Sequence, residues 1–204
     1  MQRPPRVVVF DIGNVLLDWD PRHLYRRVFD DHARMEWFLS EVCTPAWNLE
    51  QDRGRPFADA VAERIALFPD MAAEIRAYDE RWLETLAGAI QGSVDILLRL
   101  RAAGVPNYAI TNFSAEKFVD ACLHYPFLTG FDGVVVSGAE KLIKPAPEIY
   151  GVLFTRYGLD PAECVFIDDS EKNVVAAREV GMRAIHFTSP AALRDELAAL
   201  GFPV

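Results

Sequence analysis

Five short apolar runs recur along the chain, and each is bounded by polar or turn residues. Most of them are continuous rather than alternating, which is the pattern of parallel strands that are buried on both faces. Runs of this kind are too short for core helices and fit strands. The sequence therefore predicts strands over residues 6–10, 107–110, 133–136, 164–167 and 184–187.

Segments with helical periodicity follow most of these runs. In residues 93–103, Val94, Leu97 and Leu98 recur at helical spacing, and Gly104 follows as a C-terminal stop signal. Strands and helices therefore alternate, which predicts an α/β fold with a doubly wound parallel sheet and right-handed crossovers. The other helices of this part are expected over residues 114–123, 147–157, 170–180 and 190–200.

The stretch after the first strand breaks that alternation. It contains no convincing strand, and its apolar residues recur at helical spacing in residues 24–28, 37–42, 57–67 and 71–86. We therefore expect a small all-helical domain at residues 18–87. It would be inserted into an α/β core domain formed by residues 1–17 and 88–204.

Composition narrows the class of protein. The chain has 204 residues, of which 51% are hydrophobic, and its formal net charge is −9. An acidic protein with an ordinary core is not expected to bind nucleic acid, and no segment reaches the length of a membrane-spanning helix. Three scattered cysteines without CxxC spacing argue against disulfides and zinc, so we expect a cytoplasmic protein.

Polar side chains follow the predicted strands at the points where the strands end. Ligands of doubly wound sheets bind at this edge, so these side chains are expected to converge. Taken one at a time, each is ordinary as a turn residue, helix cap or surface lysine, whereas the combination at successive strand ends is not. The residues are Asp11, Thr111, Asn112, Ser137, Asp168 and Asp169, with Lys144 shortly after the third core strand.

This combination has a chemical rationale. Crowded carboxylates repel one another and need a cation, and oxygen ligands select a hard ion such as Mg²⁺. A lysine and a hydroxyl can hold the oxygens of a phosphoryl group. A carboxylate beside the metal can attack phosphorus and form an aspartyl-phosphate. The residues alone therefore favour a magnesium-dependent hydrolase with Asp11 as its nucleophile, acting on a small phosphorylated substrate.

Four motifs in the order of the chain resemble those of the haloacid dehalogenase-like (HAD) hydrolase superfamily. The resemblance extends from about Arg6 to Phe187 and implies a Rossmann-like core with a helical cap. The motifs are Phe10-Asp11-Ile12-Gly13-Asn14-Val15-Leu16, Ala109-Ile110-Thr111-Asn112, Lys144-Pro145-Ala146-Pro147-Glu148-Ile149-Tyr150, and Val165-Phe166-Ile167-Asp168-Asp169-Ser170 followed by Asn173.

The resemblance also implies roles. Asp11 would be the nucleophile and, with the backbone carbonyl of Gly13 and with Asp169, a magnesium ligand. Asp168 would be a further ligand or would support the others. By the same resemblance, Thr111 and the backbone amide of Asn112 would hold phosphate oxygens, while Lys144 would bridge the nucleophile and the phosphate.

The sequence departs from the common phosphatase pattern at Gly13, where a second aspartate usually protonates the leaving group. Losing such a group typically costs a factor of about 10² to 10⁴ in rate. Asp18 and Asp20 are the nearest spare carboxylates, although helix capping before Pro21 explains them as well. Two alternatives to a sugar-phosphate phosphatase or similar enzyme are therefore a 2-haloacid dehalogenase and a catalytically impaired binding protein of the same superfamily.

The helical domain is expected to select the substrate. The sequence gives neither the identity of the substrate nor the oligomeric state. A mixed loop around Gly54, between two helices, could close over a polar ligand. An ordinary turn, with Trp47 in the core of the helical domain, explains the same residues. The loop side chains are Trp47, Glu50, Asp52, Arg53 and Arg55.

Overall fold

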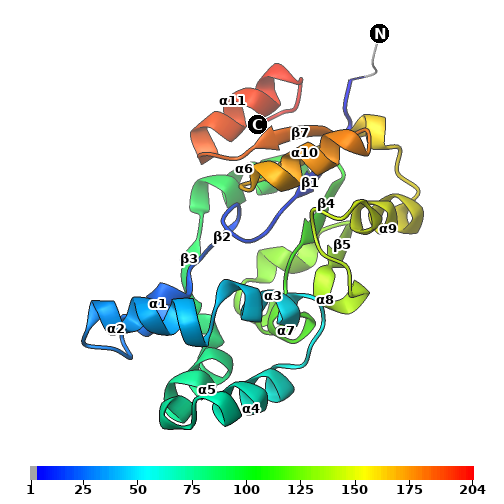
Figure 1. The fold of residues 1–204 in the computed structure, drawn as a ribbon. Helices are drawn as coiled ribbons and strands as arrows, with labels where there is room; N and C mark the ends of the chain where they lie inside the picture. The colour runs from blue at the N-terminus through cyan, green and yellow to red at the C-terminus, as the bar shows by residue number, and fades with distance from the viewer. Residues whose placement is uncertain (1–3) are drawn as a thin grey trace.

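The computed structural model describes residues 4–204, so residues 1–3 of the expected core domain lie outside the described part. A five-stranded, all-parallel sheet in the order β5-β4-β1-β6-β7 forms its centre (Figure 1). The predicted α/β fold with a parallel sheet is confirmed. The strands are β1 (Val7–Phe10), β4 (Asn107–Thr111), β5 (Gly133–Val136), β6 (Cys164–Asp168) and β7 (Arg183–His186).

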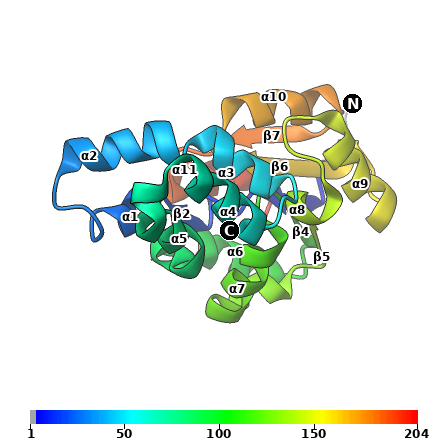
Figure 2. The ribbon, with the colours of Figure 1, turned by 60° about the horizontal axis from the view of Figure 1, so that its bottom comes forward.

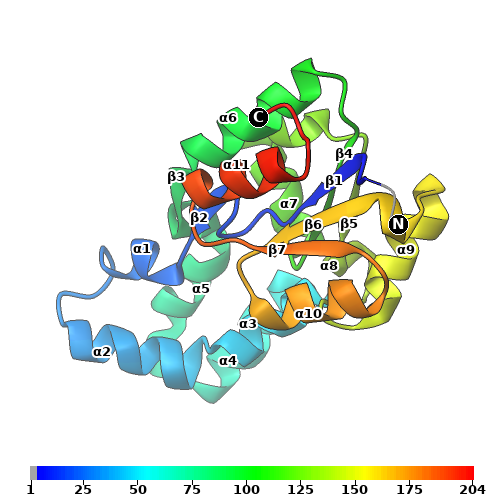
Figure 3. The same cartoon turned by 90° about the horizontal axis from the view of Figure 1, so that it is seen from above.

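The central strand β1 explains why these runs are continuously apolar. It pairs with β4 on one side and β6 on the other, and all four of its residues are buried. Val8 and Phe10 face one core cluster, and Val7 and Val9 face the other. Both faces of the strand are therefore covered, as Figure 3 shows from above.

Two groups of helices provide that cover. Residues of α6 (Gln91–Ala102) and α11 (Pro190–Ala199) belong to the cluster of Val8 and Phe10. Residues of α9 (Pro147–Tyr157) and α10 (Glu171–Glu179) belong to the cluster of Val7 and Val9. The sheet is thus doubly wound, and the remaining helical elements of this part are α7 (Ala115–His124), η4 (Pro126–Gly130), α8 (Ser137–Glu140) and η5 (Pro161–Glu163).

A helical insertion, residues 21–85, lies below the sheet in Figure 1 and comes forward in Figure 2. Aromatic side chains form its interior, where the ring of Tyr25 lies 4.8 Å from that of Phe38 and the rings of Trp47 and Tyr78 are 5.1 Å apart. Its elements are α1 (Pro21–Tyr25), α2 (His32–Trp37), η1 (Phe38–Val42), α3 (Pro45–Asp52), α4 (Phe57–Leu67), η2 (Pro69–Met71), α5 (Ala72–Glu80) and η3 (Trp82–Thr85).

Helix α3 corrects the expectation of a mixed loop around Gly54, because Trp47, Glu50 and Asp52 lie on this helix. Its start is encoded locally: the hydroxyl of Thr44 accepts a hydrogen bond from the Trp47 backbone amide at 3.0 Å, and Pro45 occupies the first turn. The loop proper is confined to the few residues around Gly54 before α4.

A two-stranded antiparallel ribbon joins the insertion to the core and was not predicted. It consists of β2 (Leu17–Trp19) and β3 (Leu86–Ala89). These strands are too short for an apolar alternation to show in the sequence. The expected boundaries at residues 17/18 and 87/88 fall inside the ribbon.

The insertion also contacts the core where α3 meets α8. The hydroxyl of Ser137 donates a 2.6 Å hydrogen bond to the backbone oxygen of Asp52. A Cβ atom on Gly54, whose φ is +100°, would lie only 2.6 Å from the backbone oxygen of Gly138, so glycine is required at this close approach. Within residues 4–204, no helix has both the length and the apolar character needed to cross a membrane.

Candidate active site

The carboxyl ends of the central strands bring most of the predicted site residues to one edge. Asp11 directly follows β1, and its backbone amide donates to the oxygen of Ile167 on β6 at 2.8 Å. Thr111 ends β4 and Asp168 ends β6. Parallel pairing in register therefore places these side chains beside one another.

Lys144 is the centre of this cluster. Its side chain is only 1% exposed, and its ammonium nitrogen lies 2.9 Å from Asp11 Oδ2 and 2.6 Å from Asp168 Oδ2. It also donates to the backbone oxygen of Ile110 at 3.0 Å. A lysine is seldom buried this deeply, and here its charge is matched by two carboxylates.

Asp168 uses its carboxylate entirely within the protein. Besides Lys144, it accepts from the Ser170 backbone amide at 2.8 Å, and the Asn173 amide nitrogen donates to both of its oxygens at 3.0 and 3.1 Å. A carboxylate has about four lone-pair sites, so these four contacts occupy them. Asn173 therefore orients Asp168, which in turn holds Lys144.

The electrostatics of the cluster follow from burial and crowding. Burial raises the pKa of Asp11; attraction to Lys144 opposes this effect, and repulsion from Asp168 adds to it. Burial alone would lower the pKa of Lys144, but its two carboxylate partners outweigh burial and raise it. Burial, followed by repulsion from Asp168, raises the pKa of Asp169. The three carboxyl groups of the cluster therefore have only one cation, Lys144, to balance their negative charge.

A second cation would balance the remaining negative charge. Asp11, Asp168 and Asp169 each have a carboxylate oxygen within 4.8 Å of those of the other two, and Asp168 supports the pair Asp11 and Asp169 because its own lone pairs are occupied. Asp169 is exposed, whereas the other two are buried. A donor set of carboxylate oxygens fits a hard divalent ion such as Mg²⁺.

Thr111 and Asn112 extend the cluster. The hydroxyl of Thr111 is buried and has no hydrogen-bond partner within the described residues. Such a group costs about 1–3 kcal/mol unless a ligand satisfies it. The Asn112 side chain exchanges two hydrogen bonds with the Lys144 backbone, at 2.8 and 3.0 Å, and so ties the two segments together.

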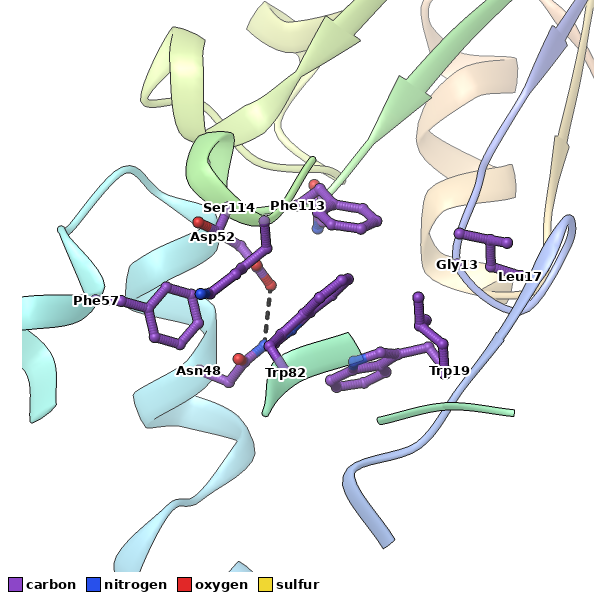
Figure 4. Close-up of a pocket in the computed structure, with 12 residues that line it drawn as sticks. Gly13, Leu17, Trp19, Asn48, Asp52, Phe57, Trp82, Phe113 and Ser114 are labelled. Atoms are coloured by element: carbon purple, nitrogen blue, oxygen red, sulfur yellow. Dashed lines mark hydrogen bonds between the residues drawn. The ribbon is translucent and has the colours of Figure 1, made fainter. Parts of the chain in front are cut away.

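A cavity of about 60 Å³ opens beside these residues and has Gly13 and Asn112 in its lining (Figure 4). A Cβ atom built on Gly13 would meet no atom of the described residues within 4 Å. The insertion supplies much of the opposite wall, including Asp52. The cavity therefore lies between the strand-end cluster and the helical insertion.

Asp18 and Asp20, the two spare carboxylates, are engaged elsewhere. Asp18 is exposed and lies 3.1 Å from the Nε2 atom of His23. Asp20 caps α1 by accepting from the Arg22 backbone amide at 2.8 Å. Neither belongs to the lining of the cavity beside Gly13.

Asn173, which follows the fourth motif of the sequence, orients Asp168, as described above. One residue of this region escaped sequence reasoning. Lys117 is buried on α7, where it lines the cavity and pairs with Asp79 of the insertion. A lysine in the helical pattern of residues 114–123 reads as a solvated surface residue, so only the tertiary contact reveals its position.

Comparison with known proteins places this geometry in context. Residues 5–181 match the family model described as "Hydrolase: haloacid dehalogenase-like hydrolase". The chain is 26% identical over 196 residues to the sesquiterpene phosphatase astK of Aspergillus oryzae, with 96% of each protein covered. It is also 26% identical over 187 residues to the fructose-1-phosphate phosphatase YqaB of Escherichia coli, with 87% of this chain and 94% of that protein covered.

A solved structure shares the fold. A HAD family enzyme from Bacteroides thetaiotaomicron, crystallised with magnesium and inorganic phosphate, superposes with a TM-score of 0.71 at 23% identity. The match covers 91% of this chain and 95% of the other.

Proposed function

Because this chain belongs to the haloacid dehalogenase-like hydrolase family, we propose that it is a magnesium-dependent phosphatase in which Asp11 attacks the phosphorus of a phosphate monoester. The observation that carries the proposal is the contact of buried Lys144 with both Asp11 and Asp168. Lys144 fixes the orientation of the Asp11 carboxylate and opposes the rise in its pKa that burial causes, and the hydroxyl of Thr111, at the end of the neighbouring strand, has no hydrogen-bond partner within residues 4–204.

In this proposal Asp11 and Asp169 hold the metal directly, together with the backbone carbonyl of Gly13. Asp168 supports them, because its lone pairs are already taken by Lys144, Ser170 and Asn173. Bound magnesium would supply the positive charge that a transferring phosphoryl group requires. The fit rests on the grouping of carboxylate oxygens and on the raised pKa values of Asp11 and Asp169.

Each of the protein's own residues has a separate role in the proposed reaction. Thr111 and the backbone amide of Asn112 hold phosphate oxygens, and the Lys144 ammonium neutralises charge as Asp11 forms an aspartyl-phosphate. Water hydrolyses this intermediate and regenerates Asp11. Since Gly13 offers no carboxyl group, the leaving group must depart with little help, so esters of acidic alcohols should react fastest.

The substrate is proposed to be a small phosphorylated metabolite. The names of the two curated relatives point to different alcohols: a sugar phosphate in E. coli and a sesquiterpene in A. oryzae. A cytoplasmic location belongs to the same proposal and rests on the scattered cysteines of the sequence.

The test is hydrolysis of 4-nitrophenyl phosphate by purified protein. We expect phosphate release that requires magnesium, stops with EDTA and is lost in Asp11→Asn. Unchanged turnover in that variant would show that Asp11 is not the nucleophile. Lys172→Met, a change on the exposed side of α10, is the matched control and should retain activity.

The same preparation separates the alternatives. Halide release from a 2-haloacid that persists in EDTA would identify a dehalogenase. Stable accumulation of phosphorylated Asp11 without turnover would identify the catalytically impaired binding protein.

A further inference from the structure

The walls of the cavity beside Gly13 are mainly apolar. The aromatic residues of these walls come from both the core and the insertion, so both parts of the protein make the cavity apolar. Indole and phenyl rings bind flat apolar groups well and offer little to a molecule rich in hydroxyl groups. The apolar lining residues are Leu17, Trp19, Phe57, Trp82, Leu86 and Phe113.

One end of this cavity reaches the strand-end cluster. Gly13 follows Asp11 by two residues, and Asn112 follows Thr111 directly. The absence of a side chain at Gly13 leaves open space there. A phosphate held at Thr111 and Asn112 therefore directs the rest of its ester into the apolar cavity.

A carboxyl group stands at the other end. In Figure 4, Asp52 and Asn48 lie opposite Gly13, with the rings of Trp82 and Phe113 between them. The Asn48 amide nitrogen donates to Asp52 Oδ2 at 3.2 Å. Asp52 is therefore the carboxyl group that meets the part of a substrate farthest from its phosphate.

The position of Asp52 is fixed by the core. Ser137 donates to its backbone oxygen at 2.6 Å, and the same hydroxyl accepts from the Phe113 backbone amide at 2.8 Å. Phe113 itself lines the cavity. One hydroxyl thus couples the carboxyl-bearing end of α3 to the segment that follows Thr111 and Asn112.

The charge of Asp52 changes near neutral pH. Burial raises its pKa to about 7, and the backbone amide of Ser114 lowers it by less. Lys117 on α7 lines the same cavity, but its ammonium group pairs with Asp79 of α5 and lies over the ring of Phe57. Tyr78 of α5 packs nearby with its own pKa raised by burial.

We propose that this cavity selects phosphate monoesters of compact, mainly apolar alcohols that carry one polar group at the far end, and that Asp52 recognises this group. The inference rests on the proposed phosphatase function and names its substrate class. A neutral hydroxyl satisfies protonated or ionised Asp52 equally well through hydrogen bonds. An ammonium group on the substrate binds more tightly only when Asp52 is ionised, because the two groups then form an ion pair.

A first experiment compares two esters whose leaving alcohols have similar acidity. We expect kcat/KM for 2-phenylethyl phosphate to exceed that for glucose 6-phosphate by about tenfold or more, because the sugar must give up its hydration to apolar walls. An equal or reversed preference would overturn the assignment of an apolar substrate.

A second experiment tests Asp52 with 4-(aminomethyl)phenyl phosphate and 4-(hydroxymethyl)phenyl phosphate. Asp52 is about one tenth ionised at pH 6 and about nine tenths at pH 8, given its pKa of about 7. The ratio of kcat/KM, amine over alcohol, should therefore rise roughly ninefold between these pH values. Titration of the catalytic groups acts on both substrates and cancels in the ratio.

Asp52→Asn should make this ratio independent of pH. Asp18→Asn is the matched control: the residue is exposed, pairs with His23 and should preserve the wild-type rise. A flat ratio in the wild type, or a persistent rise in Asp52→Asn, would refute the role of Asp52. The wild-type ratio decides the question even if Asp52→Asn fails to fold.

The two proposals fail differently. If the chain is not a phosphatase, no ester releases phosphate above the background of Asp11→Asn. If only the substrate assignment is wrong, 4-nitrophenyl phosphate is still hydrolysed, with a preference for the sugar phosphate or with a flat ratio.

Discussion

Replacing Lys144 by methionine removes the cation between two buried carboxylates and leaves a side chain of similar length. Its ammonium nitrogen lies 2.9 Å from Asp11 Oδ2 and 2.6 Å from Asp168 Oδ2. With an effective dielectric constant of about 20, each contact contributes roughly 6 kcal/mol of attraction. Most of this offsets the cost of burying the charges, and breaking such a pair typically destabilises a protein by about 3–5 kcal/mol.

Urea unfolding at pH 7 without metal measures this loss. With a slope of about 2–3 kcal/mol per molar urea, the midpoint for Lys144→Met should fall by roughly 1–2.5 M. The double variant Lys144→Met/Asp168→Asn should recover more than about 1 kcal/mol, because one of the two uncompensated charges is gone. Lys172→Met, which is exposed on α10, should change the unfolding free energy by less than about 0.5 kcal/mol.

The reasoning fails if Lys144→Met lowers the unfolding free energy by less than about 1 kcal/mol, or by no more than Lys172→Met does. Either result would mean that the carboxylates of Asp11 and Asp168 do not depend on Lys144 for their burial. A destabilised Lys144→Met without recovery in the double variant would locate the loss in packing rather than in charge.

Two further substitutions test the contacts around the site. Gly54→Ala should lose about 1–3 kcal/mol more unfolding free energy than Gly104→Ala, since both glycines have positive φ but only Gly54 faces a backbone oxygen; equal losses in urea unfolding would contradict that close approach. Thr111→Val should raise the inhibition constant of inorganic phosphate about tenfold or more without lowering the urea midpoint, because its hydroxyl has no hydrogen-bond partner among residues 4–204; unchanged inhibition would exclude Thr111 from phosphate binding.

The sheet could be predicted from the sequence because its strands are buried on both faces. A short, continuous apolar run such as Val7–Phe10 indicates a strand that is buried on both faces. Strand Gly133–Val136 was predicted with its observed bounds. The convergence of Asp11 and Asp168 follows from parallel strand ends, whereas Lys144 reaches them from the segment between α8 and α9. Their catalytic roles remain predictions that the substitutions above test.

The parts that escaped prediction depend on contacts between distant segments. Strands β2 and β3 gain their structure from pairing with each other across the insertion, so neither segment signals a strand by itself. Helix α3 was missed although Thr44 and Pro45 mark its start. The cavity position of Asp52 follows from the bond of its backbone to Ser137, 85 residues away in sequence.

The ribbon of β2 and β3 carries both connections between the insertion and the sheet. Leu17 pairs with Ala89 and Asp18 with Gly88, so the chain leaves and re-enters the core at neighbouring points. A module attached in this way can be exchanged for another of different length without rethreading the core strands. Grafting a foreign helical module between these paired residues would transfer its leaving-group preference while keeping the Asp11, Lys144 and Asp168 cluster, which makes the ribbon a natural crossover point for building hybrid enzymes.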